Sequence, residues 1–78
     1  MKKVVIYSTP TCVYCNAAKD LFNAHNISYT EHNVASDLEK RREMMDKSGQ
    51  MGVPVITIDD ELIVGYNQPK IAAALGIN

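Results

Sequence analysis

The spacing of apolar and polar positions in the first part of the chain predicts a strand, a helix and a second strand. A short apolar run predicts a buried strand over residues 3–8. Apolar residues then recur at helical spacing, so we expect a helix with Thr11 as its N-cap and an end near Asn26. An extended segment over residues 27–34 predicts the second strand. The predicted apolar face of the helix consists of Ala17, Ala18, Leu21, Phe22 and His25.

A capping box marks the start of a second helix. Ser36 is followed three residues later by Glu39, a pair typical of helix N-termini, and Gly49 provides the stop signal. We expect this helix to cover one face of the sheet with a narrow apolar stripe, while its charged residues meet water. The predicted stripe consists of Leu38, Met44 and Met45.

Turn residues divide the last part of the chain into a hairpin and a final helix. Two apolar runs predict strands over residues 55–58 and 62–64, and the short acidic connection between them predicts an antiparallel pair. A helix over Lys70–Leu75 should follow, with Asn67 as its N-cap and Gly76 as its stop.

The resulting order, βαβαββα, predicts an α/β domain with a four-stranded mixed sheet flanked by three helices. The first half is a βαβ unit, which should form a right-handed parallel crossover, and the second half is a hairpin with a helix. The 78 residues show no repeat, linker or low-complexity stretch. We therefore expect one domain over residues 1–78.

Composition and charge exclude several kinds of partner. Eight basic and nine acidic residues leave a net charge of −1, so there is no electrostatic basis for binding nucleic acid or a membrane surface. No apolar run approaches the roughly 20 residues that span a bilayer. The N-terminus has no signal-peptide pattern. A small secreted protein usually has several disulfides, whereas this chain has a single close pair of cysteines. We therefore expect a cytoplasmic protein, and we expect it to be a monomer.

Both cysteines lie within residues 8–15, between the first predicted strand and the first predicted helix. A Cys-x-x-Cys pair at that place is typical of a thiol–disulfide redox site. A thiol attacks as the thiolate, and the unpaired N–H groups and dipole of a helix N-terminus favour an anion at Cys12. Cys15 lies one turn further into the helix. We expect it to be less exposed and to attack a mixed disulfide formed on Cys12.

Two other interpretations of the cysteines stay open. They could form half of a zinc site, for which His25 and His32 are the candidate partners. Six residues separate those histidines, in place of the usual three to five. The cysteines could also be small buried hydrophobes without a reaction. Their position at a strand-to-helix junction favours the redox interpretation.

Three stretches give the chain a resemblance to the glutaredoxins, in their compact bacterial form. Residues 7–15 are similar to the family's strand and Cys-Pro-Tyr-Cys loop, residues 48–54 to its Thr-Gly-Gln-Arg-Thr-Val-Pro segment, and residues 65–67 to its Gly-Gly-Cys-Asp turn. The resemblance implies a thioredoxin-like fold and a glutathione-dependent thiol–disulfide oxidoreductase. Its substrates would be protein disulfides or glutathionylated proteins. Glutathione would be the co-substrate, with no metal and no tightly bound cofactor.

The resemblance also implies a role for each matched residue of the reactive centre. Cys12 would be the nucleophile and Cys15 the resolving thiol. Pro54 would be cis and would leave the backbone N–H and C=O of Val53 free to pair with an extended substrate. Tyr14 would flank the cysteine of glutathione. From the sequence alone, a trans proline at a strand start and a surface aromatic residue are also admissible.

A second group of matched residues would hold the two ends of glutathione. Asn67, with the adjacent backbone N–H groups of the Gly65–Tyr66 turn, would hold the γ-glutamyl end at a helix N-terminus. Gln50 would reach the glycyl carboxylate. A plain N-cap for Asn67 and a solvated loop side chain for Gln50 are the structural alternatives. Lys19, one turn beyond the second cysteine, could stabilise a thiolate or simply meet water.

Three residues depart from the family pattern. Val13 replaces the proline between the cysteines, which removes a restriction on the helix start. Met51 stands where many glutaredoxins have arginine, and Thr9 where many have lysine. Because both lost charges would have attracted glutathione carboxylates, binding should be weaker or should depend on Gln50 and on backbone groups.

These departures raise alternatives to a glutaredoxin. Small redoxins of the same fold take electrons from thioredoxin reductase and pass them to ribonucleotide reductase or another reductase, and Val13 fits their pattern. Tyr14 and Asn67 fit the glutaredoxins better, and the chain lacks the tryptophan that those redoxins carry before the last helix. Further alternatives are an iron–sulfur carrier with a cluster shared between two subunits, and a non-catalytic binding module.

Overall fold

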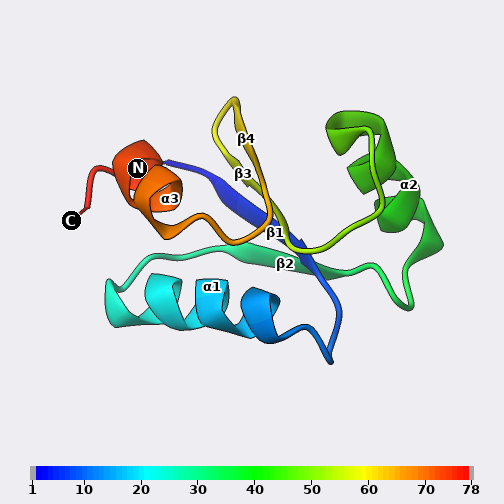
Figure 1. Ribbon diagram of the computed structural model, residues 1–78, viewed down its shortest axis with the longest axis horizontal. Helices are drawn as coiled ribbons and strands as arrows, with labels where there is room; N and C mark the ends of the chain where they lie inside the picture. Colours follow the sequence, from blue (N-terminus) through cyan, green and yellow to red (C-terminus); the bar gives the residue numbers. More distant parts are fainter. Residues whose placement is uncertain (1, 78) are drawn as a thin grey trace.

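The computed structural model contains one four-stranded mixed sheet flanked by three helices (Figure 1). The strand order is β2-β1-β3-β4. The structure describes residues 2–77, so Met1 and Asn78 at the ends of the predicted domain lie outside it. β1 pairs in parallel with β2 and antiparallel with β3, which pairs antiparallel with β4, and this confirms the predicted βαβαββα order. None of the helices within this part has the length and apolar character needed to cross a bilayer. The elements are β1 (Val4–Ser8), α1 (Val13–Ala24), β2 (Thr30–Asn33), α2 (Leu38–Ser48), β3 (Val55–Ile58), β4 (Glu61–Val64) and α3 (Gln68–Leu75).

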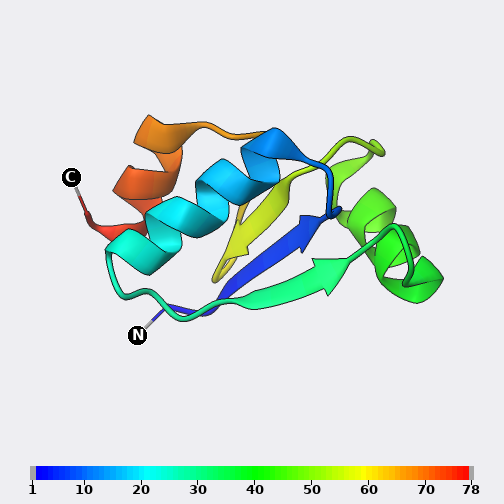
Figure 2. The ribbon, with the colours of Figure 1, turned by 90° about the horizontal axis from the view of Figure 1, so that it is seen from below.

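The two faces of the sheet carry separate apolar cores. Side chains alternate along a strand, so Val4 and Ile6 of β1 face one core while Tyr7 faces the other. On the second face, α2 contributes Met44 to a smaller cluster with Tyr7 and Val55. Figure 2 shows α2 beyond the arrowheads of β1 and β2. The larger cluster, built with α1 and α3, consists of Val4, Ile6, Ala18, Phe22, Ile56, Ile58, Ile63, Ile71 and Ala74.

The predicted apolar stripe of α2 is confirmed at Met44 and wrong at Leu38 and Met45. Met44 is buried, but Leu38 is 71% exposed and Met45 is 38% exposed. α2 lies at the end of the strands and not along them, so the turn around Met44 supplies its buried contact. His25 was also expected on the apolar face of α1, but it is exposed because α1 ends at Ala24 and the chain leaves the helix there.

Three predicted helix signals are confirmed. Asn67 is the N-cap of α3, where its side-chain oxygen accepts a hydrogen bond from the backbone N–H of Lys70 at 3.2 Å. Gly49 ends α2 and Gly76 ends α3, with φ values of 72° and 73°. This left-handed conformation favours glycine, which lacks the Cβ that would make it costly.

The predicted N-caps of the first two helices were each one residue too early. The N-cap of α1 is Cys12 and not Thr11. The N-cap of α2 is Asp37 and not Ser36, because the Asp37 carboxylate accepts the backbone N–H of Lys40 at 3.1 Å. A carboxylate also interacts more favourably than an uncharged hydroxyl with the positive end of the helix dipole.

Some element boundaries also differ from the prediction. β2 is shorter than residues 27–34, because the N–H of Ile27 still closes the end of α1 by donating to the C=O of Phe22 at 2.8 Å. β4 begins at Glu61, within the predicted turn. α3 begins at Gln68, two residues before the predicted start, because a proline is tolerated in the first turn of a helix.

Tyr7 connects β1 to α2. Its side chain is buried, and its hydroxyl donates a hydrogen bond to the carboxylate of Glu43. Burial, followed by the hydrogen bond to the Glu43 carboxylate, raises the pKa of Tyr7 well above its ordinary value of 10.0. The same hydrogen bond lowers the pKa of Glu43 below its ordinary value of 4.5. Both shifts favour the neutral phenol beside the ionised carboxylate, so the bond stabilises the folded state.

We expect Tyr7→Phe to lower the free energy of unfolding by about 1 kcal/mol, since the freed carboxylate is partly exposed and can meet water. The lowered pKa of Glu43 stabilises the fold above pH 4.5, and this stabilisation is lost as the pH falls through the folded-state value. The raised pKa of Tyr7 stabilises the fold below pH 10.0, and this stabilisation is lost as the pH rises above it. Urea denaturation across this range should show the difference from the parent protein vanish at both ends.

Tyr29→Phe is the matched control. The Tyr29 ring packs against Phe22, with ring centroids 5.3 Å apart, and its hydroxyl takes part in none of the hydrogen bonds described within residues 2–77. Its loss should change the free energy of unfolding by less than about 0.5 kcal/mol. An equal loss in the two variants would show that the bond to Glu43 adds no stability.

Candidate active site

Three segments that are distant in sequence meet at one end of the sheet. Tyr7 of β1 pairs with Val55 of β3, and Val55 pairs with Val64 of β4. The segments that follow β1, precede β3 and follow β4 must therefore lie side by side just beyond this row. The N–H of Gly65 donates to the C=O of Pro54 at 2.8 Å, which joins two of the segments directly.

Cys12 occupies the junction between the loop after β1 and α1. Its N–H donates to the C=O of Thr9 at 3.3 Å, and its own C=O accepts the N–H of Asn16 at 3.1 Å. Its Sγ accepts the N–H of Cys15 at 3.1 Å. The sulfur therefore acts as the N-cap of α1, where a free N–H group and the helix dipole stabilise negative charge. This arrangement favours the thiolate form of Cys12.

Cys15 is buried in the first turn of α1, whereas Cys12 is partly exposed. The two form a disulfide, with their Cα atoms 5.1 Å apart. This confirms the expected order of exposure. Of the two residues, Cys12 is therefore the one accessible to a molecule that approaches from solvent.

The segment before β3 presents one residue with unpaired backbone groups, Val53. The Val53–Pro54 peptide bond is cis, which confirms the form that the resemblance implied, and Pro54 is buried. Within residues 2–77, neither the N–H nor the C=O of Val53 has a hydrogen-bond partner. An extended chain can use such groups to add itself to a sheet as a short strand.

Gln50 folds back onto its own loop. Its side-chain amide donates to the C=O of Gly52 at 3.1 Å, and its side-chain oxygen accepts the N–H of Gly52. The hydroxyl of Ser48 accepts a further bond from the same amide at 3.3 Å. These contacts shape the loop that leads to Pro54, and the expected contact of Gln50 with a ligand remains a prediction.

The other residues expected at the site lie around its rim. Tyr14 follows Cys12 in the first turn of α1 and is exposed, whereas Tyr66 is partly buried against the larger core. Asn67 is exposed at the start of α3. Its side-chain oxygen is used as the cap, so its amide N–H groups remain available to a ligand.

Lys19 is held by a partner that the sequence did not reveal. Its ammonium lies 2.7 Å from the Glu31 carboxylate, which also accepts the hydroxyl of the buried Ser8 at 2.8 Å. The hydrogen bond from Lys19, followed by that from Ser8, lowers the pKa of Glu31. Glu31 reaches Lys19 because Ile6 and Glu31 are paired in the parallel β1–β2 ladder, a register that no local pattern in the sequence encodes.

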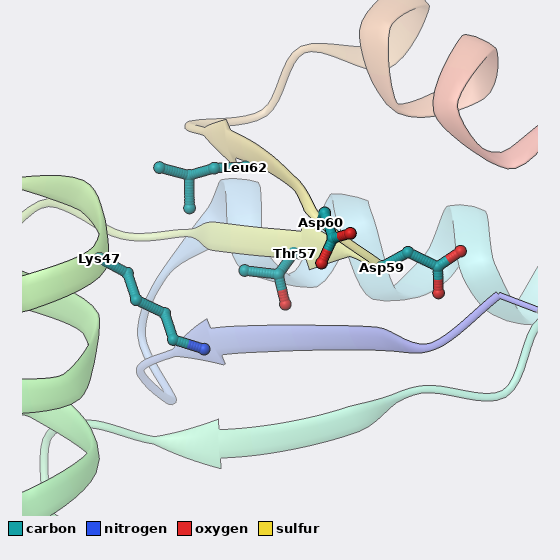
Figure 3. Close-up of a pocket in the computed structure, with 5 residues that line it drawn as sticks. All are labelled: Lys47, Thr57, Asp59, Asp60 and Leu62. Atoms are coloured by element: carbon teal, nitrogen blue, oxygen red, sulfur yellow. The ribbon is translucent and has the colours of Figure 1, made fainter.

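Neither cysteine lines the hollow in Figure 3. It measures about 300 Å³ and opens between Lys47 of α2 and the β3–β4 hairpin. The remaining lining residues are Thr57, Asp59, Asp60 and Leu62. None of the residues expected at the reactive centre lines it.

The histidines do not join the cysteines in a cluster. Within residues 2–77, no three side chains of histidine, cysteine, aspartate or glutamate come together as the ligands of a metal ion would. His32 instead packs against the ring of Tyr7, with centroids 5.4 Å apart, and His25 is exposed at the end of α1.

Comparison with known proteins identifies relatives that cover most of the chain. A family model described as glutaredoxin matches residues 4–63. The chain is 47% identical over 68 residues to an uncharacterized glutaredoxin-like 8.6 kDa protein in the rubredoxin operon of Clostridium pasteurianum, covering 87% of this chain and 91% of that protein. It is 40% identical over 65 residues to glutaredoxin 3 of Escherichia coli K12, covering 83% of this chain and 78% of the relative.

Solved structures show the same fold. A mutant of the thioredoxin-like protein BC3987 superposes with a TM-score of 0.92 at 28% identity, covering 100% of both chains. A buckwheat glutaredoxin–glutathione complex superposes with a TM-score of 0.75 at 22% identity, covering 96% of this chain and 71% of the other. These likenesses confirm the predicted thioredoxin-like fold.

We expect the two cysteines of the reduced protein to differ strongly in reactivity. Iodoacetamide near neutral pH should modify Cys12 at least about tenfold faster than Cys15, because Cys12 is the accessible sulfur and the one at the helix N-terminus. Mass spectrometry of the digested protein at successive times gives both rates. In urea the rates should converge, which provides the control. Modification of Cys15 as fast as Cys12 in the folded protein would contradict the assignment of roles.

Proposed function

This chain belongs to the glutaredoxin family of thiol–disulfide oxidoreductases, and we propose that it transfers electrons from glutathione to protein disulfides and glutathionylated proteins. The observation that carries the proposal is the position of Cys12. Its partly exposed sulfur accepts a backbone N–H at the start of α1, with the cis Pro54 segment and the start of α3 at the same end of the sheet.

The proposed reaction is a pair of thiol–disulfide exchanges. The Cys12 thiolate attacks one sulfur of the substrate disulfide, so that the substrate S–S bond breaks and its other sulfur leaves as a thiolate. Cys15 loses its proton to solvent and attacks the Cys12 sulfur, which releases the second substrate thiolate and closes the Cys12–Cys15 disulfide. Two electrons have then passed to the substrate. Two glutathione thiols restore the dithiol by the same exchange and leave as glutathione disulfide.

Glutathione is an extended tripeptide with a carboxylate at each end, and the proposed groove offers groups for each part. The N–H and C=O of Val53 pair with the backbone of its cysteine, while Tyr14 flanks that cysteine. The amide of Asn67 and the backbone of the Gly65–Tyr66 turn hold the γ-glutamyl carboxylate near the start of α3. Gln50 completes the groove at the glycyl end. A relative of the same fold that binds glutathione supports this arrangement.

A second candidate is a redoxin that is reduced by thioredoxin reductase. Val13 between the cysteines and the uncharged Met51 and Thr9 favour it, because the site lacks cations that would attract glutathione. We hold it as the alternative, since Tyr14 and Asn67 match the glutaredoxin pattern. In either case we propose a monomer that acts in the cytoplasm, where reducing systems maintain thiols.

A coupled assay separates the two electron sources. We expect the protein to reduce a small mixed disulfide at the expense of NADPH when glutathione and glutathione reductase are present. With thioredoxin reductase alone we expect no turnover, because the proposed electron donor is glutathione. Turnover confined to the thioredoxin reductase arm would replace the proposed donor by the alternative one.

Two cysteine variants assign the steps of that reaction. Cys12→Ser should abolish turnover in the glutathione arm, and turnover that survives it would exclude the proposed mechanism. Cys15→Ser should still reduce a glutathione mixed disulfide, since a second glutathione can resolve the intermediate on Cys12. It should lose the reduction of protein disulfides that need the second cysteine.

Asn67→Ala should affect stability and glutathione binding together. Loss of the N-cap should lower the free energy of unfolding by about 1 kcal/mol. Loss of the ligand contact should raise KM for glutathione at least about tenfold, as expected for one hydrogen bond to a charged group. The matched control is Asp37→Ala at the N-cap of α2, which should lose similar stability and leave KM unchanged. If KM stays constant in both variants, Asn67 is only a helix cap.

A further inference from the structure

The three segments that form the site contain no charged residue. Residues 9–16, 48–54 and 64–69 lack aspartate, glutamate, lysine and arginine, although such residues make up 22% of the chain. The strand pairing described above places the ends of these segments that border β1, β3 and β4 side by side. The absence of charge is therefore shared by the three segments that meet just beyond these strands.

The lysines nearest to these segments along the chain interact with other residues or lie beside the groove at the start of α3. Lys19 pairs with Glu31, and the ammonium of Lys47 lies 6.0 Å from the centre of the Tyr7 ring on the α2 side of the sheet. Lys70, in the first turn of α3, borders the part of the groove assigned to the γ-glutamyl end. Val13 and Met51 belong to segments that contain no lysine or arginine.

Large apolar side chains replace charge in these segments. Val13 is 74% exposed, Tyr14 is 64% exposed and Met51 is 51% exposed. Two of them adjoin Cys12 in the first turn of α1, and the third lies in the loop that leads to Pro54. We call these three residues the apolar rim. Exposed apolar side chains on segments that border a reactive sulfur indicate a contact surface, because a partner bound there would bury them.

The unpaired backbone of Val53 defines the shape of the occupant. A chain that pairs with the N–H and C=O of Val53 must be extended, and its side chains on either side of the reacting cysteine must then meet the surface around Cys12. Apolar side chains would bury area against the apolar rim. Charged side chains would lose hydration there without an opposite charge to pair with.

We propose that the apolar rim makes this protein selective for disulfides within extended peptide segments whose cysteine has apolar neighbours, and that Met51 is the main determinant of this selectivity. The inference rests on the proposed thiol–disulfide exchange and names the substrate class of the same site. Met51 acts by contact with the flanking side chains and takes no part in the exchange of electrons. The reduced dithiol supplies the two electrons, and each substrate disulfide yields two thiols.

The test uses the full chain, reduced with dithiothreitol and then freed of it, in a single turnover without glutathione. The substrates are three disulfide-linked peptide dimers in which the cysteine is flanked by leucine, aspartate or lysine. Each rate is divided by that of the same peptide with dithiothreitol, which removes differences in intrinsic reactivity. The leucine peptide should react about fivefold faster than either charged peptide, as expected for burying part of one methionine side chain.

Two arginine variants show where the selectivity originates. Met51→Arg should abolish the preference for leucine over aspartate and make the aspartate rate fall with added salt. Met45→Arg, the same change on α2 outside the uncharged segments, should keep the preference of the parent protein. Equal normalised rates for the three peptides, or the same response in both variants, would overturn the proposal. Because the test needs no glutathione, it gives its answer even if the coupled assay shows a different electron donor.

Discussion

The antiparallel pairing of β1 with β3 is the constraint on which the reactive centre depends. It sets Tyr7 opposite Val55, so the end of β1 and the beginning of β3 lie at the same edge. β4 extends the row through the pair of Val55 and Val64. A slip of one residue would turn Ile6 and its neighbours out of the larger core, because side chains alternate along a strand. The same burial that stabilises the sheet therefore fixes the alignment of the site.

The start of α1 combines a structural role with a chemical one. Cys12 occupies the position at which helices need an acceptor for a free N–H group, and its sulfur accepts the N–H of Cys15. A thiolate satisfies that donor better than a thiol, so the helix stabilises the reactive form. Val13 at the first helical position leaves this arrangement intact without the family's proline. The buried Cys15 follows one turn along.

Charged side chains join elements of this fold and are absent from the segments around the cysteines. The bond from Tyr7 to Glu43 joins α2 to the sheet, and the pair of Lys19 and Glu31 joins α1 to β2. The segments around Cys12 present backbone groups, a helix N-terminus and apolar side chains in place of charge. Such a surface provides little long-range attraction for carboxylates, but burial of its apolar side chains against an apolar chain is favourable.

The sequence by itself determined the features that depend on neighbours within one helical turn. It correctly predicted the order of the elements, the roles of Asn67, Gly49 and Gly76 at helix ends, and the relative exposure of the two cysteines. Each of these follows from local backbone geometry and short-range hydrogen bonds. Even so, the sequence did not distinguish two neighbouring N-cap candidates, because Asp37 and not Ser36 is the N-cap of α2.

Only the tertiary structure decided which side chains from distant segments meet. The sequence did not reveal that Met44 and not Leu38 faces the core, because Met44 packs against Tyr7 and Val55, which come from distant strands. Nor did it reveal that Lys19 pairs with Glu31, since strand register is fixed by the burial of the whole sheet. Local periodicity specifies which residues share a face of a helix or strand. Which other element packs against that face depends on the total apolar area that the whole fold buries.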